Sequence, residues 1–302
     1  MPKTLLRALG SVLIVGAAGV SATPAQADSP PARERVRSYR TPWTDAVPSV
    51  YADVNSGLPF VTLVYVPLCN NAQIACGGRK AGDPSSLDKN LYWGGGFGVR
   101  RFLDVMPKTW ERVSTSGPDG HVLQQLVYRR QVSGSLWGRK QKHELVEQLL
   151  ILRAVHGAEI DRAVDDFAAL AEHGGYVTFR EGDDDRWTDR RVLVHVAGYA
   201  GHNRLMDGKK LEIAAETSAS ATPSFVLACR SDAYFSNALR TAGSQPLLMT
   251  RDLMAPEGYV IEAMARALGD RVTETMLRQR VVAAYARWQR IPERTASLIF
   301  AR

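Results

Sequence analysis

Two stretches, VLVHVAGYAGHN at residues 192–203 and SFVLACRSD at residues 224–232, decide how this chain folds. Each begins with a continuous apolar run that contains β-branched residues, which is typical of a strand buried on both faces of a parallel sheet. We expect strands over residues 192–199 and 224–229. Ligands in open α/β sheets bind beyond the carboxyl ends of the strands. His202, just past the first strand, and Cys229, at the tip of the second, are therefore expected to face each other across a cleft.

Segments with strand and helix patterns alternate along the rest of the chain, which predicts an α/β fold with a mostly parallel sheet. Residues 145–155 are apolar and fit either a strand or a helix, and the acidic stretch at 181–190 is expected to be a charged turn. Further strands are expected at 60–68, 122–132 and 246–250, and helices at 90–103, 158–173, 233–240, 256–268 (with proline at its start) and 272–290.

The N-terminal region has the pattern of an export signal. A basic start is followed by a short run of small apolar residues and by the A-x-A site that ends at Ala27, so residues 1–27 are expected to be a signal peptide. An uncleaved membrane anchor is the alternative, although a spanning helix needs about 20 apolar residues. Residues 28–50 are expected to form an extended, proline-containing leader, and residues 51–302 the α/β domain with its C-terminal helix.

The chain contains three cysteines, an odd number that is informative in an exported protein. Cys69 and Cys76 lie close together in a polar loop and are expected to form a disulfide in an oxidising compartment. Cys229 then remains a free thiol. It is either a nucleophile, paired with the histidine of the preceding strand end, or a small buried residue of the core.

The order of the two motifs, a strand followed by Gly201-His202 and then a strand that ends in Ala228-Cys229, resembles the caspase-like cysteine peptidases of clan CD. Segments such as NLYWG at residues 90–94 also resemble an uncharacterised set of bacterial exported proteins. The clan resemblance implies a caspase-like three-layer sandwich in which Cys229 is the nucleophile and His202 the acid–base. It further implies that Gly201 and Asn203 border the cleft and its oxyanion site. This chain has Asn203 where the clan usually has glycine after the histidine.

The sequence as a whole therefore favours a secreted or periplasmic cysteine peptidase that acts on a polypeptide. The alternatives are a non-catalytic binding module on the same fold and a thiol-dependent transferase or non-peptide hydrolase. The formal charge of +7 is scattered along the chain, so we expect no nucleic-acid partner. We also expect no association with a membrane once the signal peptide is removed. No cofactor and no metal site are expected, since the histidines lack metal-ligand spacing and His195 is expected to be packed in the core.

The signal assignment makes a direct prediction about the mature chain. Cleavage after Ala27 should leave Asp28 as the first residue of the exported protein, because the small residues at the A-x-A site suit signal peptidase. N-terminal sequencing of protein recovered outside the cytoplasm is expected to read from Asp28. A sequence that begins at Met1 would instead support the membrane anchor.

Overall fold

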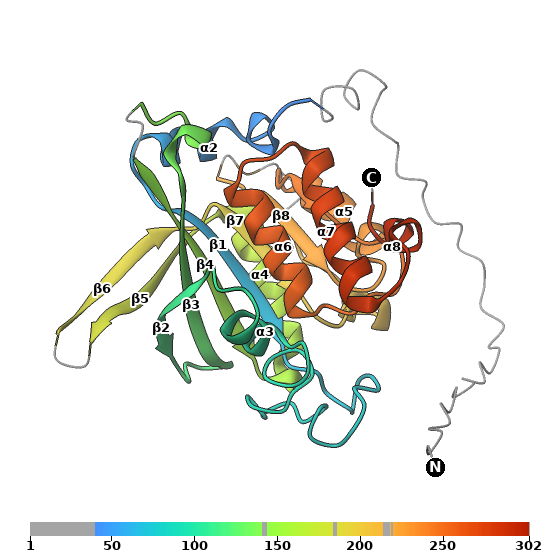
Figure 1. The fold of residues 1–302 in the computed structure, drawn as a ribbon. Coiled ribbons are helices and arrows are strands. Elements are labelled where there is room, and N and C mark those ends of the chain that lie inside the picture. Colours follow the sequence, from blue (N-terminus) through green and yellow to red (C-terminus); the bar gives the residue numbers. More distant parts are fainter. Residues whose placement is uncertain (1–39, 141–143, 184–185, 214–217, 219, 302) are drawn as a thin grey trace, which may run out of the picture.

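The computed structural model describes residues 40–301, except for residues 141–143, 184–185, 214–217 and 219; the expected signal peptide, at residues 1–27, lies outside them. A mixed sheet of seven strands, in the order β2-β3-β4-β1-β7-β8-β9, forms the centre (Figure 1). The five strands β4, β1, β7, β8 and β9 run parallel, and β3 and β2 extend the sheet in antiparallel fashion. The strands are β1 (Phe60–Pro67), β2 (Glu111–Ser116), β3 (Val122–Ser133), β4 (Leu145–Val155), β7 (Val196–Ala200), β8 (Ser224–Leu227) and β9 (Pro246–Leu248). The predicted α/β class with a mostly parallel sheet is confirmed.

Burial explains why the central strands read as continuous apolar runs. All eight residues of β1 are buried, because the strand lies between β4 and β7 and is covered on both faces. Residues 145–155, which fitted either a strand or a helix, form β4. This strand pairs with β1 on one side and with β3 on the other. Backbone hydrogen bonds on both sides therefore favour a strand over a helix.

Helices cover both faces of the sheet, which makes the architecture compatible with a three-layer sandwich (Figure 1). On one face Phe167 and Phe235 pack with Tyr199. On the other face Tyr259 and Leu277 share a core with Val64. The helices are α2 (Pro48–Asn55), α3 (Val99–Val105), α4 (Ile160–His173), α5 (Ser231–Thr241), α6 (Gly258–Gly269), α7 (Glu274–Gln289) and α8 (Glu293–Ile299). Among the helices of the described residues, none is both long and apolar enough to cross a membrane.

The strand predicted over residues 192–199 is wrong as a single element. Val192 and Leu193 end β6 (Arg186–Leu193), which pairs with β5 (Tyr176–Asp183) in a separate hairpin, whereas β7 starts at Val196. At the junction His195 donates its backbone N–H to the carbonyl of Val61 at 2.9 Å. One apolar run thus belongs to two sheets. The hydrophobic pattern alone does not show where the chain leaves one sheet and enters the other.

The charged segment at residues 181–190 is not a simple turn, because residues 181–183 and 186–190 belong to the two strands of the hairpin that projects away from the helices (Figure 1). Charged side chains pair with one another across the ribbon. Arg190 bonds Glu181 at 2.5 Å and Glu147 of β4 at 2.7 Å, and Glu181 also bonds Arg129 of β3. Opposite charges that face each other across strands stabilise such a ribbon. Because these charged side chains stand where apolar ones would alternate, the sequence did not indicate strands here.

Two predicted helix starts are also wrong. The helix expected from residue 90 begins only at Val99, after a series of turns, because the glycines before it touch neighbouring backbone. A Cβ at Gly94 would lie 2.2 Å from the carbonyl oxygen of Leu87. The helix expected from Pro256 begins at Gly258 with Glu257 as its N-cap, so the proline precedes the helix instead of occupying its first turn.

Part of the expected leader, residues 28–50, belongs to the folded core. Trp43 is fully buried, and its indole N–H donates to the carbonyl of Leu268 at 3.1 Å. Its ring packs edge-on against Trp137. Helix α2 then begins at Pro48, inside the same segment. Pro42 therefore precedes a short turn that contains the buried tryptophan and Pro48 starts a helix, whereas residues 28–39 lie outside the described residues.

The packed-core prediction for His195 is confirmed. Its side chain is 2 % exposed, and its Nδ1 accepts the backbone N–H of Val61 at 3.2 Å. Burial lowers the pKa of His195 to about 4, from 6.5, because the imidazolium would lose its hydration. The folded state therefore holds the ring neutral well below the pH at which the unfolded chain would protonate it.

This burial predicts a loss of stability in mild acid. The contribution is fully present above pH 6.5 and falls as the pH drops towards 4, because only the unfolded state then binds the proton. His195→Gln should flatten the pH dependence by about 2 kcal/mol between pH 7 and 4.5, measured by urea unfolding. His173→Gln, at an exposed end of α4, is the matched control and should leave the dependence as it is. Equal slopes for wild type and His195→Gln would contradict the prediction.

Candidate functional site

The parallel pairing of β7 with β8 brings the two predicted site residues to one edge of the sheet. Ala200 is in register with Leu227, and the ladder continues with a hydrogen bond from the N–H of Gly201 to the carbonyl of Leu227 at 3.2 Å. Two residues beyond this last pair come His202 and Cys229. Because adjacent parallel strands keep their register, the two residues leave the sheet at the same level, on neighbouring strand ends.

Cys229 sits in a tight turn between β8 and α5. Arg230, the N-cap of α5, has a φ of 50°, in the left-handed region that residues other than glycine seldom adopt. Ser231 and Thr250, both fully buried, hold this turn. The Ser231 hydroxyl donates to the carbonyl of Val226 at 2.8 Å, and the Thr250 hydroxyl donates to that of Ala228. Strained backbone that its surroundings enforce in this way is common at functional sites.

The sulfur of Cys229 is free and partly exposed, and it lies against the backbone of Met254. The N–H of Met254 donates to Sγ at 3.5 Å, and Sγ lies 3.7 Å from the carbonyl oxygen of the same residue. Two tyrosines lie near the thiol. Burial raises the pKa of Tyr92, and the negative charges of Cys229 and Glu257 add to this effect. Burial likewise raises the pKa of Tyr285, whose hydroxyl accepts the N–H of Ala255 at 3.2 Å.

His202 is mostly buried, with a side chain that is 12 % exposed. Its Nε2 lies 2.6 Å from Oδ2 of Asp207, and its backbone carbonyl accepts the hydroxyl of Tyr199 at 2.7 Å. Arg204 donates to the same oxygen of Asp207 at 2.9 Å. The imidazole is therefore held by a carboxylate that the sequence reading did not assign to it.

Asn203 and Gly201, the residues expected to border the cleft, have structural tasks. Asn203 is fully buried, and its amide donates to the carbonyl of Cys229 at 2.6 Å while its oxygen accepts the N–H of Leu205 at 3.0 Å. The side chain thus ties the loop after β7 to the loop after β8, and both of its ends are occupied. A Cβ at Gly201 would lie 2.8 Å from Cγ of Pro67, so a close approach of β1 and β7 requires glycine there.

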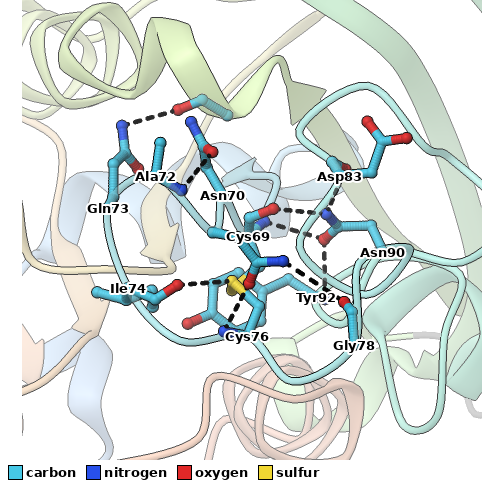
Figure 2. Close-up of a disulfide and its surroundings, with 12 residues drawn as sticks. Cys69, Asn70, Ala72, Gln73, Ile74, Cys76, Gly78, Asp83, Asn90 and Tyr92 are labelled. Atoms are coloured by element: carbon cyan, nitrogen blue, oxygen red, sulfur yellow. Dashed lines mark hydrogen bonds between the residues drawn. A yellow bond between two sulfur atoms is a disulfide. The ribbon is translucent and has the colours of Figure 1, made fainter.

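The loop after β1 borders the same edge, and its disulfide is as predicted. Cys69 and Cys76 are bonded, with Cα atoms 6.1 Å apart (Figure 2). Asn90, fully buried, fixes this loop from within. Its oxygen accepts the N–H groups of Cys69 at 2.9 Å and Tyr92 at 3.1 Å, and its amide donates to the carbonyls of Cys69 and Asp83, both at 2.8 Å (Figure 2). Tyr92, two residues after Asn90, lies near Cys229.

The two predicted site residues share an edge, but each side chain is bonded to another partner. Among the described residues no hydrogen bond joins the ring of His202 to the sulfur of Cys229. Two surface hollows, of about 340 and 360 Å³, lie elsewhere, beside Trp110. The part of the chain that the structure describes holds no cluster of histidine, cysteine and acidic side chains suited to a metal ion. The strand ends define the candidate site.

Comparison with known proteins adds no relative. The chain matches no family model, no curated protein and no solved structure. The site is therefore defined by its own geometry.

Sequence reasoning missed several residues that hold the site together. Asp207 lies only five residues after His202, so this local spacing could have suggested their contact. A short 3₁₀ turn, capped by Asn203, brings the two side chains together. Thr250 and Met254 carry no such signal. They reach Cys229 only because β9 pairs in parallel with β8 and the chain then turns back over the strand end.

The braced turn at Cys229 predicts a clear effect of Thr250→Val. This change removes a buried hydroxyl that donates to the carbonyl of Ala228 and accepts the N–H of Ser231, which should cost about 1–3 kcal/mol of unfolding free energy. Urea denaturation measures this loss. The control, Thr241→Val at the exposed end of α5, should change stability by less than about 0.5 kcal/mol. Equal effects of both substitutions would show that the hydroxyl of Thr250 contributes little.

Proposed function

We propose that this chain is an exported cysteine hydrolase that cleaves polypeptides, with Cys229 as nucleophile and His202 as its acid–base. One observation carries the proposal: the free thiol and the imidazole leave adjacent parallel strands at the same level. The disulfide between Cys69 and Cys76 supports export, because such bonds persist in oxidising compartments.

The order of the parallel strands supports a caspase-like sandwich as the scaffold. Numbered by their occurrence along the chain, the strands β4-β1-β7-β8-β9 follow the order 2-1-3-4-5 of doubly wound sheets. Such sheets bind ligands where the strand order reverses, here between β1 and β7. The loop after β1 contains the disulfide and Tyr92, and the loop after β7 contains His202.

The reaction follows from these groups. The sulfur of Cys229 attacks the carbonyl carbon of the peptide bond, and the thiol proton passes to His202. The C–N bond then breaks, the amine leaves with the proton from His202, and a thioester to Cys229 remains. Water, deprotonated by His202, hydrolyses the thioester, which releases the acid and restores the thiol.

Backbone groups at the turn suit the oxyanion that forms in these steps. The N–H of Cys229 donates to no described group and lies at the N-terminal end of α5, where the helix dipole favours negative charge. Donors of this kind contribute about 10²–10³ in rate where they have been removed elsewhere. Both polar ends of the Asn203 side chain are already hydrogen-bonded, so backbone N–H groups are the donors proposed for the oxyanion.

A binding module is the second candidate, and one observation favours it. The ring of His202 bonds Asp207 and the sulfur of Cys229 contacts the backbone of Met254, so that each reactive group is bonded to its own neighbour. On this hypothesis Cys229 packs the turn, and the strand ends bind a ligand without turnover.

The hydrolase proposal predicts selective chemistry at one thiol. Wild-type protein should react with iodoacetamide and with peptidyl acyloxymethyl ketones at Cys229, as mass spectrometry of tryptic peptides would show. His202→Gln should slow the reaction with the ketone at least about tenfold, because acid–base groups contribute roughly 10²–10⁴ in rate. With a cleaved peptide in hand, Cys229→Ala and His202→Ala should each abolish turnover, and the double variant should be hardly worse, since the two residues act as a unit.

His173→Gln, on an exposed helix end, is the matched histidine control and should leave labelling unchanged. Cys229→Ala removes a single sulfur and should keep the native circular dichroism spectrum. A thiol that reacts only after unfolding, together with a Cys229→Ala variant that does not fold, would rule out the hydrolase and favour the binding module.

A further inference from the structure

The contact between His202 and Asp207 has a geometry that goes beyond an ordinary surface ion pair. The two side chains are 12 % and 38 % exposed, and Nε2 lies 2.6 Å from Oδ2. Exposed pairs of long side chains contribute little and move freely. Here the imidazole is mostly buried, and the carboxylate bonds it at a short distance.

Asp207 is itself held in place from two directions. It ends the 3₁₀ turn Arg204–Asp207, which begins with the cap by Asn203, and the amide of Asn203 also bonds the carbonyl of Cys229. Arg204 donates to Asp207 and, at 2.8 Å, to Asp161 of α4. Asp207, His202 and the backbone of Cys229 therefore form one connected unit that is anchored to a helix.

The carboxylate stays ionised in this setting. Burial alone would raise the pKa of Asp207, but the hydrogen bonds and positive charges of His202 and Arg204 outweigh it and hold this pKa below its ordinary value. An ionised carboxylate accepts hydrogen bonds only. Its partner Nε2 must consequently carry the hydrogen, and in the neutral ring the lone pair is then on Nδ1.

We propose that Asp207 is a positioning residue that fixes His202 in the Nε2–H tautomer, so that Nδ1 exchanges the proton with Cys229 and with the leaving amine. This role rests on the proposed hydrolase. It adds a third member to the pair of His202 and Cys229, and it assigns each ring nitrogen a task. Asp207 touches the imidazole and no reacting atom of the substrate.

A spectroscopic readout tests the tautomer without any activity. Nitrogen-15 NMR of histidine-labelled protein distinguishes protonated from unprotonated ring nitrogens, and His202→Gln identifies the signals. In wild type with the ring neutral, Nε2 should carry the hydrogen. In Asp207→Asn, whose amide can donate as well as accept, the Nδ1–H form should gain a substantial share. Asp207→Glu should restore the wild-type pattern at least in part.

A reactivity readout then connects the tautomer to chemistry. Asp207→Asn should slow labelling of Cys229 by a peptidyl acyloxymethyl ketone, and slow peptide turnover, by roughly tenfold to a hundredfold, with partial rescue by Asp207→Glu. Asp165→Asn is the matched control. It removes a carboxylate that bonds Lys209 of the same loop at 2.8 Å without touching His202, and it should change neither readout.

The outcomes separate the two proposals. An unchanged tautomer in Asp207→Asn overturns the positioning role, whatever the reactivity of Cys229. An altered tautomer with full reactivity also overturns it, since the fixed ring would then be irrelevant to the chemistry. A wild-type thiol that is inert, with the ring in the Nε2–H form, overturns the hydrolase and leaves the contact between Asp207 and His202 as a structural tie.

Discussion

The parallel pairing of β7 with β8 is the constraint on which the candidate site depends. It fixes the level at which His202 and Cys229 leave the sheet, and the hydrogen bond from Gly201 to Leu227 carries the register past the last paired residues. A slip of one residue in either strand would turn its side chains to the other face. The register of the two strands thus determines which residues reach the site, and the buried apolar residues of both strands maintain this register.

Polar contacts then convert this register into a defined local geometry. Asn203 is the central one, because a single amide caps the turn that presents Asp207 and also holds the carbonyl of Cys229. A glycine at this position, which is the usual residue in the resembling peptidases, could make neither bond. The side chain of Asn203 therefore has a structural role, since it ties the loop after β7 to the loop after β8.

The sequence predicted those features that leave a local or periodic trace. The apolar runs of β1 and β8, the amphipathic helix that ends before Gly174 and the nearby cysteines of one loop are of this kind. It failed where one run serves two sheets, at residues 192–199, and where cross-strand ion pairs replace apolar alternation, as in β6. The bracing of Cys229 by Thr250 depends on long-range pairing between strands, which periodicity does not encode.

The contacts around Cys229 also limit what the site can be. Arg230, directly after Cys229, is left-handed, a buried hydroxyl bonds the carbonyl of Ala228 directly before it, and a carboxylate bonds the imidazole at the neighbouring strand end. Such strain persists only where surrounding structure enforces it, and several bonds enforce it here. A pure binding module would require the strand ends to recognise a ligand, but it would not require a free thiol and a histidine bonded to Asp207 on neighbouring strand ends. The strained turn, the free sulfur and the imidazole bonded to Asp207 are the features on which the proposed nucleophile depends.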